Sequence, residues 1–505
     1  MRMIKSALSV ASFTIFSRLT GYFRDILMAK FMGTSIVMDA LVIAIKVPSF
    51  LRRIFAEGAL NSSFIPIYSS LLVDNKDKAQ SFLNDVLSIM VAILLCVVFV
   101  FEIFMPNILS LILTNSSKDF IDLTIFFSRI TFPFILLISL TAFFSGALNS
   151  IERFASAASS QIGGNCFIIF VMLLINPQDI AKGTDVAFAI MGSGLVQLLW
   201  VAIPCYIYGI RPKIKSVKMT EDVKLFTKRM LPAAFGAGVL QLNLLVDMWI
   251  ATLLPGGTNS YLYYADRFYQ FPISITGTAM GTVLLPLLTK LWRENKHKEA
   301  SYYQNRSIEF TLLLTLPAMV CLYFFSEPLV RLSFERGAFK SEATLAVTQT
   351  VLGFTIGLPA YILAKIFNSS FFARQNTMIP TIVAVGSMFV NLFLNLALMN
   401  TYKHLGIALS TSLAAWFNVF VLAYLLKKRG EFSIDKRLLM YVLKTSTLSL
   451  TLFFAFFFIM PLLKGFFASE LLFMVTSFSL FAICYLGCMR ILNCLKFKDY
   501  VGIDA

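Results

Sequence analysis

The feature of this sequence that most constrains its fold is a series of apolar stretches, each long enough to cross a lipid bilayer. A membrane-spanning helix needs roughly 20 predominantly apolar residues, and about fourteen such stretches follow one another here. The chain is 58% hydrophobic and only 14% charged, whereas soluble domains are about 25% charged. We therefore predict an all-α polytopic membrane protein. The expected spans are 7–33, 36–70, 84–113, 120–148, 155–176, 184–209, 224–254, 259–290, 305–326, 345–373, 379–400, 405–427, 438–463 and 468–493.

The charges between these stretches predict an orientation. If the N-terminus is inside, the inner connections and both ends hold 26 Lys and Arg, and the outer connections hold seven. Cytoplasmic loops of membrane proteins carry such an excess of cations. We expect a multi-pass protein of the bacterial inner membrane with both termini cytoplasmic. The net charge of +16 then needs no nucleic-acid partner. The basic, apolar N-terminus is expected to be a retained first helix, because Arg18 interrupts its apolar core.

The chain also has the pattern of a duplication. "GALNSSFIPIYSSLL" late in the second span is similar to "GTAMGTVLLPLLTKL" late in the eighth, and the two share a proline, Pro66 and Pro286. We predict a six-helix lobe at 1–215, a second at 220–430, and two additional helices with a tail at 436–505. Repeated halves around a midplane site are typical of transporters. Shared membrane-helix composition is the alternative explanation.

Buried charge is the strongest functional signal. Ten Lys and Arg lie inside the predicted spans, and they cluster in the first two. A charge at the centre of a membrane helix costs about 2.5–3.5 kcal/mol, so such residues normally face a bundle interior or a water-filled cavity. The cations of this set are Arg18, Arg24, Lys46, Arg52, Arg53 and Arg267, and the acids near them are Asp25, Asp39, Glu57 and Asp266.

These cations reach similar depths. Arg24 lies nine residues before the turn at Gly33, which is roughly 13 Å along a helix. Lys46 and Arg267 lie at comparable distances from their own turns. Cations exceed acids in the set, and this surplus points to an anionic ligand, phosphate or carboxylate, which arginine binds bidentately. The alternative is a ladder of ion pairs: Arg24 with Asp25 or Asp39, Arg53 with Glu57, and Asp266 with Arg267.

The second span carries a proline among its charges. Pro48 lies between Lys46 and Arg52, and prolines bend membrane helices. A bent helix that carries charge is suited to act as a moving gate, so we assign a gating or structural role to Pro48, together with Asp39, Glu57 and Asp266.

Three stretches resemble a known family. "FSRLTGYFRD", "MDALVIAIKVPSFLRRIFAEGALNSSFIPIYS" and "YLYYADRFYQFPISITGTAMGTVLLPLL" are similar to the MurJ (MviN) family of lipid II flippases, in the superfamily that also holds the MATE exporters. The resemblance covers nearly the whole chain. It implies two six-helix lobes in a V, two further helices that form a groove for a lipid tail, and movement of undecaprenyl-diphosphate-linked peptidoglycan precursor to the outer leaflet.

The same resemblance implies roles for individual residues. Four arginines match the family's cavity arginines, and five further residues match polar partners in the same motifs. The arginines are Arg18, Arg24, Arg52 and Arg267, and the partners are Ser17, Asp25, Asp39, Lys46 and Glu57. No position in these motifs departs from the family pattern.

A second polar set suggests an ion. Asp247 in the seventh span, Asn391 and Asn395 in the eleventh, and Thr411 in the twelfth offer oxygen ligands of the kind that a hard cation such as Na⁺ prefers. Hydrogen bonding between helices is the alternative role for the two asparagines and the threonine.

We therefore expect a transporter rather than an enzyme, without a cofactor. There is no Walker-type phosphate loop, and neither the His nor the Cys residues have the spacing of metal ligands. Na⁺, a proton gradient or the membrane potential would drive transport by a monomer. The first alternative is a related flippase or exporter with another lipid-linked oligosaccharide or small molecule as cargo. The second is a membrane glycosyltransferase, which would need more carboxylates in a large outer loop than 326–344 provides.

Overall fold

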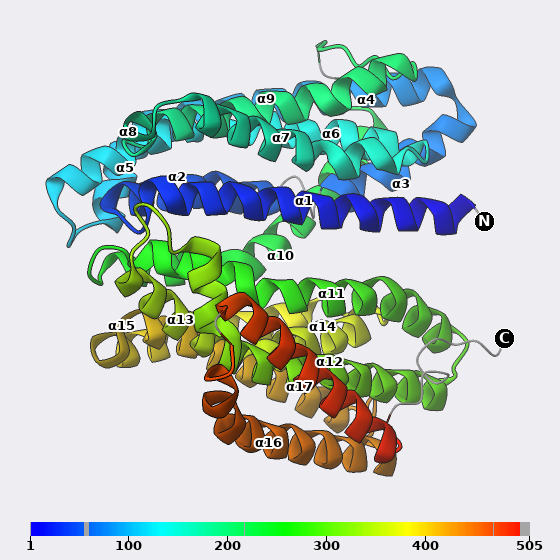
Figure 1. The fold of residues 1–505 in the computed structure, drawn as a ribbon. Helices are drawn as coiled ribbons and strands as arrows, with labels where there is room; N and C mark the ends of the chain where they lie inside the picture. Colours follow the sequence, from blue (N-terminus) through cyan, green and yellow to red (C-terminus); the bar gives the residue numbers. More distant parts are fainter. Residues whose placement is uncertain (1, 55–59, 217, 468, 495–505) are drawn as a thin grey trace. The chain divides into compact units, whose positions relative to one another are not determined.

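The computed structural model describes residues 2–54, 60–216, 218–467 and 469–494, and the part of the chain so described consists of helices and their connections, without a strand (Figure 1). The helices pack into two compact units. Unit 1 comprises residues 1–260 with 336–340, and unit 2 comprises 261–335 with 341–505. These units are defined by how the helices pack and not by internal similarity of the sequence. The predicted duplication, with its boundaries at 215, 220 and 436, therefore stays a prediction.

Unit 1 is built around a group of long helices that pack side by side (Figure 1). The helix α7 packs against both α1 and α9, α6 packs against α9, and α2 packs against α5. The helices are α1 Arg2–Met32, α2 Ile36–Arg52, α3 Asn61–Asp74, α4 Lys76–Ile112, α5 Lys118–Thr131, α6 Phe134–Ser150, α7 Phe154–Leu174, α8 Pro177–Ile180, α9 Thr184–Ile207 and α10 Glu221–Thr252.

Unit 2 is organised around α12. This helix packs against α13, α14, α16 and α17, and α15 packs against α13 and α14. The helices are α11 Thr258–Arg293, α12 His297–Phe334, α13 Ser341–Thr355, α14 Leu358–Phe372, α15 Met378–Lys428, α16 Lys436–Lys464 and α17 Glu470–Ile491. The chain of α15 turns back on itself at Lys403, whose φ of 49° and ψ of −128° are not helical, which agrees with the predicted break between residues 400 and 405.

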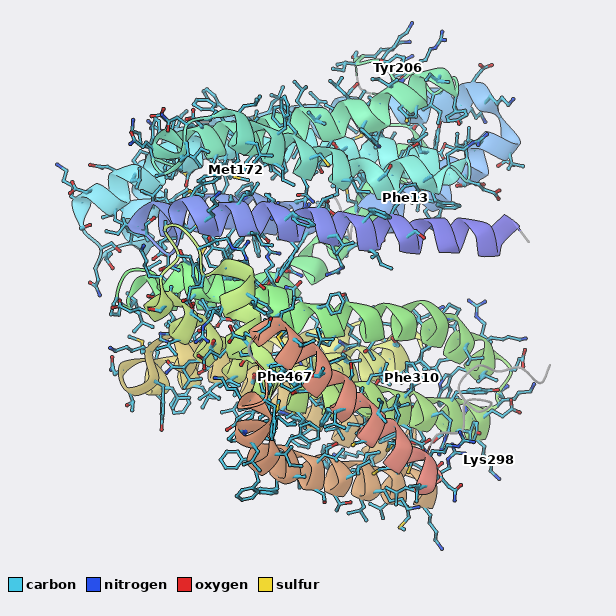
Figure 2. All side chains as sticks on the ribbon, in the orientation of Figure 1. Phe13, Met172, Tyr206, Lys298, Phe310 and Phe467 are labelled. Atoms are coloured by element: carbon cyan, nitrogen blue, oxygen red, sulfur yellow. The ribbon has the colours of Figure 1, made fainter. Side chains whose placement is uncertain are left out.

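Apolar side chains fill the interior and also cover the outside. In unit 1 the ring of Phe64 stacks on those of Tyr68 and Phe82, with centroids 5.1 and 5.8 Å away. On the surface, Leu111 is 77% exposed and Phe458 is 70% exposed; Figure 2 shows the side chains on both units. Exposed apolar side chains in this number are unfavourable in water and are expected where the solvent is lipid.

The length and composition of many helices in the described chain are those of membrane-spanning helices. Nine helical segments of the described chain are long and apolar enough to cross a membrane. The helices α1, α2, α10 and α11 are outside those nine, and each of them is charged or short. Within the described residues, the predicted ranges fall on single helices or on pairs of consecutive helices, except that 379–400 and 405–427 are the two limbs of α15. That all fourteen ranges cross the membrane stays a prediction.

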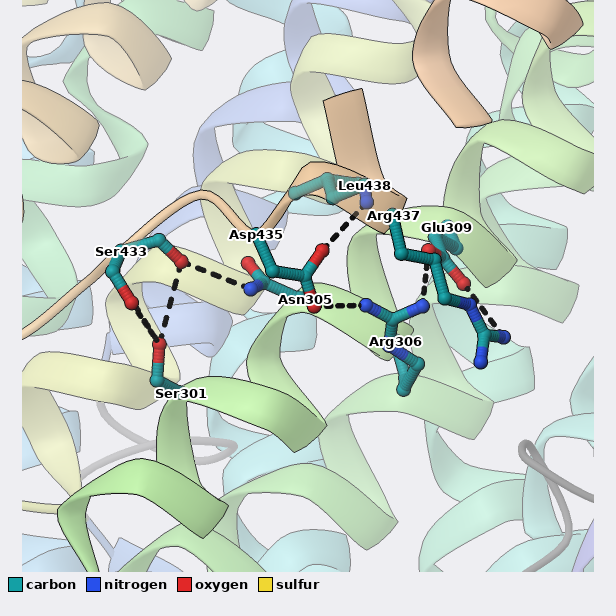
Figure 3. Close-up of polar contacts among 8 residues, drawn as sticks. All are labelled: Ser301, Asn305, Arg306, Glu309, Ser433, Asp435, Arg437 and Leu438. Carbon is teal, nitrogen blue, oxygen red and sulfur yellow. Dashed lines mark hydrogen bonds and ion pairs between the residues drawn. The ribbon is translucent and has the colours of Figure 1, made fainter. Parts of the chain in front are cut away.

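Ion pairs fasten the additional helix α16 to α12 (Figure 3). The Arg306 guanidinium pairs with Glu309 on its own helix and with Asp435, and Arg437 pairs with Glu309 at 3.3 Å. Asp435 also accepts a hydrogen bond from the Leu438 backbone N–H at 2.6 Å and so caps α16. One network therefore fixes both the start and the position of α16.

Candidate functional site in the charged first hairpin

The first helix contributes four of the predicted site residues. Ser17, Arg18, Arg24 and Asp25 all lie in α1, which packs along α7. Arg18 is exposed, Ser17 is buried, and the Asp25 carboxylate is 1% exposed. Arg18 and Asp25 are seven residues apart, and between them this face of the helix changes from exposed to almost wholly buried.

Arg24 is held in place by two neighbours. Its Nη2 lies 2.8 Å and its Nε 3.1 Å from the same oxygen of Asp25, and its Nη1 donates to Asn165 Oδ1 of α7 at 3.0 Å. The side chain of Arg24 is 21% exposed. The ion pair between Arg24 and Asp25, which was the alternative explanation for these two charges, is therefore present. The Asp25 carboxylate fixes the orientation of the Arg24 guanidinium.

Two amide side chains on α7 complete this arrangement. Asn165 Nδ2 donates to the Ser17 carbonyl oxygen at 3.2 Å and to Thr20 Oγ1 at 3.3 Å. Ser17 Oγ donates to Gln161 Oε1 at 3.4 Å. The sequence analysis did not select Asn165 or Gln161. The available signal was their spacing of four residues, which places both on one face of a membrane helix.

The second helix contributes partly buried cations. Lys46, Arg52 and Arg53 are of intermediate exposure and Pro48 is buried. Arg53 Nη1 donates to Gln241 Oε1 of α10 at 3.0 Å. The helix changes to a wider turn at Arg53, a deviation that often occurs at functional sites. Glu57, the predicted partner of Arg53, lies outside the described residues.

Asp39 joins α2 to the first turn of α11, whose residues up to Ser260 belong to unit 1. Its two carboxylate oxygens accept hydrogen bonds from the backbone N–H of Gly257 at 2.6 Å, from the backbone N–H of Ser260 at 2.8 Å, and from Ser260 Oγ at 2.5 Å. The first N–H groups of a helix have no partner within it and favour a negative charge. Asp39 is thus a helix cap supplied from 218 residues away, consistent with the structural part of its predicted role.

A backbone contact closes the turn between α1 and α2. Gly33 has a φ of +59°, and a Cβ on it would lie 2.4 Å from the Ala338 carbonyl oxygen. The Ala338 N–H in turn donates to the Lys30 carbonyl oxygen at 2.8 Å. Glycine is required at position 33, both for its conformation and for this close approach.

In unit 2, α11 carries the remaining predicted cation. The Arg267 guanidinium lies over the Tyr263 ring, 4.5 Å from its centroid. Asp266 accepts a hydrogen bond from Gln270 Nε2 at 2.5 Å. The aromatic face stabilises the guanidinium by a cation–π interaction, so Arg267 is oriented by an aromatic ring one helical turn away.

The residues of the predicted ion set fall in both units. Asp247 is buried in α10 of unit 1, while Asn391, Asn395 and Thr411 lie in α15 of unit 2. Within α15, Ser387 Oγ donates to the Ala414 carbonyl oxygen at 2.8 Å across the two antiparallel limbs. One turn further along each limb places Asn391 opposite Thr411. Both asparagines are fully buried. No group of three or more metal-ligating His, Cys, Asp or Glu occurs among the described residues.

Together, the fold and the charged hairpin define a class of protein. Helices with lipid-compatible surfaces carry arginines that are fixed by partners inside the helix packing, an arrangement typical of membrane transporters that handle anionic cargo.

Comparison with known proteins identifies the family. Residues 28–481 match the family described as lipid II flippase MurJ. A probable lipid II flippase MurJ of Rhizobium meliloti is 38% identical over 448 residues, which is 87% of this chain and 83% of the relative. The lipid II flippase MurJ of Burkholderia cenocepacia is 31% identical over 85% of both chains. The chain belongs to the MurJ family.

Solved structures agree with this assignment. The structure described as lipid II flippase MurJ in an inward closed conformation superposes with a TM-score of 0.80, at 30% identity, over 96% of this chain and 98% of that one. An inward-facing MATE family transporter superposes with a TM-score of 0.64 at 13% identity, over 85% of this chain, which shows a shared fold. The predicted family and MATE-like architecture are confirmed, and the glycosyltransferase alternative is wrong, because this is a family of flippases.

Proposed function

We propose that this chain transports lipid II, the undecaprenyl-diphosphate-linked peptidoglycan precursor, from the inner to the outer leaflet of the bacterial inner membrane by alternating access. The observation that carries the proposal is the fixed orientation of Arg24, which Asp25 and Asn165 hold at the interface of α1 and α7. Membership of the MurJ family supports the cargo.

The chemistry of the predicted site suits a diphosphate. A guanidinium offers five N–H groups in a planar fork that matches two phosphate oxygens. In unit 1 we assign diphosphate contacts to Arg24 and its neighbours Arg18, Arg52, Arg53 and Lys46. Ser17 and Asp25 position them. In unit 2 we assign the same role to Arg267, held by Tyr263.

The test is the exposure of labelled lipid II on the outer leaflet, measured with matched arginine variants. Arg24→Ala and Arg267→Ala should each abolish exposure while the amount of protein in the membrane stays normal. Arg24→Lys should restore only part of it, because an ammonium keeps the charge and loses the bidentate geometry. Arg129→Ala, at an exposed position of α5, is the control. Normal transport by both alanine variants would refute the proposal.

We also propose that Na⁺ assists the return of the carrier, held in unit 2 by Asn391, Asn395 and Thr411 of α15. The support is the burial of the two asparagines and the placement of Asn391 opposite Thr411. Oxygen ligands of this kind suit a hard cation. Asn391→Ala should then remove any dependence of transport on Na⁺ and leave its dependence on membrane potential. Transport that is equally fast without Na⁺ would contradict this role.

A further inference from the structure

The connection between α9 and α10 is a second cationic feature, and the transport site does not use it. We call residues 208–216 and 218–220 the basic linker. The side chains of Arg211, Lys213, Lys215 and Lys218 are all exposed. Arg153, from the connection between α6 and α7, places its guanidinium 4.5 Å from the centre of the Tyr208 ring and adds a fifth cation at this end of unit 1.

The backbone of the basic linker is fastened to α4. Polar side chains along one side of that helix bind successive backbone groups of the linker, so the linker runs as an extended chain against the helix. Gln80 Nε2 donates to the Arg211 carbonyl oxygen at 2.9 Å, and the backbone N–H groups of Lys213, Lys215 and Lys218 donate to Asn84 Oδ1 at 2.7 Å, Ser88 Oγ at 3.0 Å and Asp85 Oδ1 at 3.2 Å.

Buried apolar residues hold both ends of this segment. Ile210 at one end and Val223 and Phe226 beyond the other belong to the core of unit 1, and the Phe226 ring meets that of Phe82 of α4 edge-on at 6.2 Å. A chain anchored at both ends and bonded between them loses little further conformational freedom when its side chains bind a partner. The linker is therefore a preorganised surface.

The order of residues places cations on one face. Arg211, Lys213 and Lys215 are two residues apart, and in an extended chain residues at this spacing point to the same side. Pro212, between the first two, is buried. All three charged side chains are exposed, so they point away from the core of unit 1.

The surroundings are those of a membrane surface. The linker follows directly on α9, a candidate span that ends at Ile207. Tyr206 (Figure 2) and Tyr208 are exposed there, and tyrosine is enriched at the boundary between lipid and water. Ile214 and Met219 are 68% and 62% exposed among the lysines. Cations mixed with exposed apolar side chains are typical of segments that bind the headgroup region of a bilayer.

We propose that the basic linker is a docking surface for the headgroups of acidic phospholipids. The lysines pair with the phosphates, and Ile214 and Met219 enter the boundary of the acyl chains. The surface is built by α4, so it depends on the fastening of the backbone as well as on the charges. A soluble polyanion would satisfy the cations and leave the apolar side chains in water, which is why a lipid surface fits better.

The experiment places a photo-crosslinking amino acid at Ile214 of the full-length chain in vesicles of phosphatidylcholine and phosphatidylglycerol in equal parts. Crosslinked lipids are then identified by mass spectrometry. Phosphatidylglycerol should be enriched over phosphatidylcholine at least about threefold, because each Lys or Arg near the surface favours anionic lipid. High salt should reduce this enrichment. The same probe at Leu111, at the other end of α4, should show none.

Matched variants distinguish the effect of this surface from the effect of the net charge of the chain. Lys213→Gln with Lys215→Gln and Lys218→Gln should bring the ratio to that of the bulk lipid. Lys290→Gln with Lys296→Gln and Lys298→Gln, which removes the same charge from exposed positions elsewhere, should leave the enrichment unchanged. Asn84→Ala with Ser88→Ala should reduce it although every cation remains.

Four results would overturn the proposal. They are equal crosslinking of both lipids by the unaltered protein, crosslinking to protein in place of lipid in native membranes, an equal loss of enrichment in both lysine triples, and full enrichment after Asn84→Ala with Ser88→Ala.

Discussion

At the scale of the residue, the geometry of Arg24 depends on Asn165 as well as on Asp25. Asn165 bonds both the Arg24 guanidinium and the backbone of α1. Asn165→Ala removes these contacts and leaves the charge of Arg24 intact. A hydrogen bond to a charged group is worth about 1.5–3 kcal/mol, so we expect transport of lipid II to fall by roughly tenfold or more, measured as precursor exposed on the outer leaflet.

The control for this prediction lies one turn away on the same helix. Gln161 accepts only a long hydrogen bond of 3.4 Å from Ser17, so Gln161→Ala should reduce transport much less than Asn165→Ala. Equal effects of the two substitutions would mean that the packing of α7, and not the orientation of Arg24, is what matters.

The difference between Arg24 and Asn165 shows what sequence can predict at this scale. Charges inside an apolar stretch are conspicuous, so Arg24 and Asp25 could be selected from the sequence alone. Neutral amides are common in membrane helices, and no spacing connects residue 24 with residue 165. The Asp266 carboxylate accepts a hydrogen bond from Gln270, a neighbour that the sequence analysis did not select although a helix brings residues four apart together.

At the scale of the element, the cluster around Arg306 fixes α16 against α12. The side chain of Arg306 is 3% exposed and that of Glu309 is 0% exposed. Removing one partner of a buried ion pair costs about 3–5 kcal/mol, and Arg306→Ala takes away one of the two cations that pair with Glu309 in this cluster. Arg306→Ala should therefore lower the melting temperature of the purified protein clearly. Lys182→Ala breaks an exposed pair with Asp179 and should change it little; a similar shift for both variants would disprove the buried role.

The cap on α11 gives a second prediction for an element. Asp39→Ala removes all acceptors for Gly257 and Ser260, and loss of a cap costs about 0.5–2 kcal/mol. Hydrogen exchange at the first turn of α11 should become faster by roughly threefold to thirtyfold. Ser260→Ala, which removes one of the three bonds, should have a smaller effect. Unchanged exchange in Asp39→Ala would show that the carboxylate does not hold this turn.

Elements were more predictable than their contacts. The ranges of apolar residues located the helices, and the polar stretch around Lys403 located the reversal within α15, because both follow from local sequence. The capping of α11 by Asp39 was not predictable, because Asp39 and Gly257 are 218 positions apart in the chain and meet only in the folded protein. The ion pairs at the start of α16 depend on folding in the same way.

At the scale of the whole molecule, the distribution of charges predicts the orientation of the chain in the membrane. Inner connections and ends hold 26 Lys and Arg against seven in the outer ones, if the fourteen ranges all cross the membrane. An even number of spans places both termini on the same side, which we propose is the cytoplasm. One range that failed to cross would reverse every connection after it, so probes are needed in both halves of the chain.

The orientation can be tested with single cysteines and a maleimide that does not cross membranes, in a chain whose exposed Cys96 and Cys166 are replaced by alanine. Asn115→Cys and Glu342→Cys, in predicted outer connections of the two halves, should react in intact spheroplasts. Lys298→Cys, at an exposed position (Figure 2), should react only after the membrane is opened. Labelling of Asn115→Cys but not Glu342→Cys would place an uncounted or missing span between them, and labelling of Lys298→Cys alone would invert the whole topology.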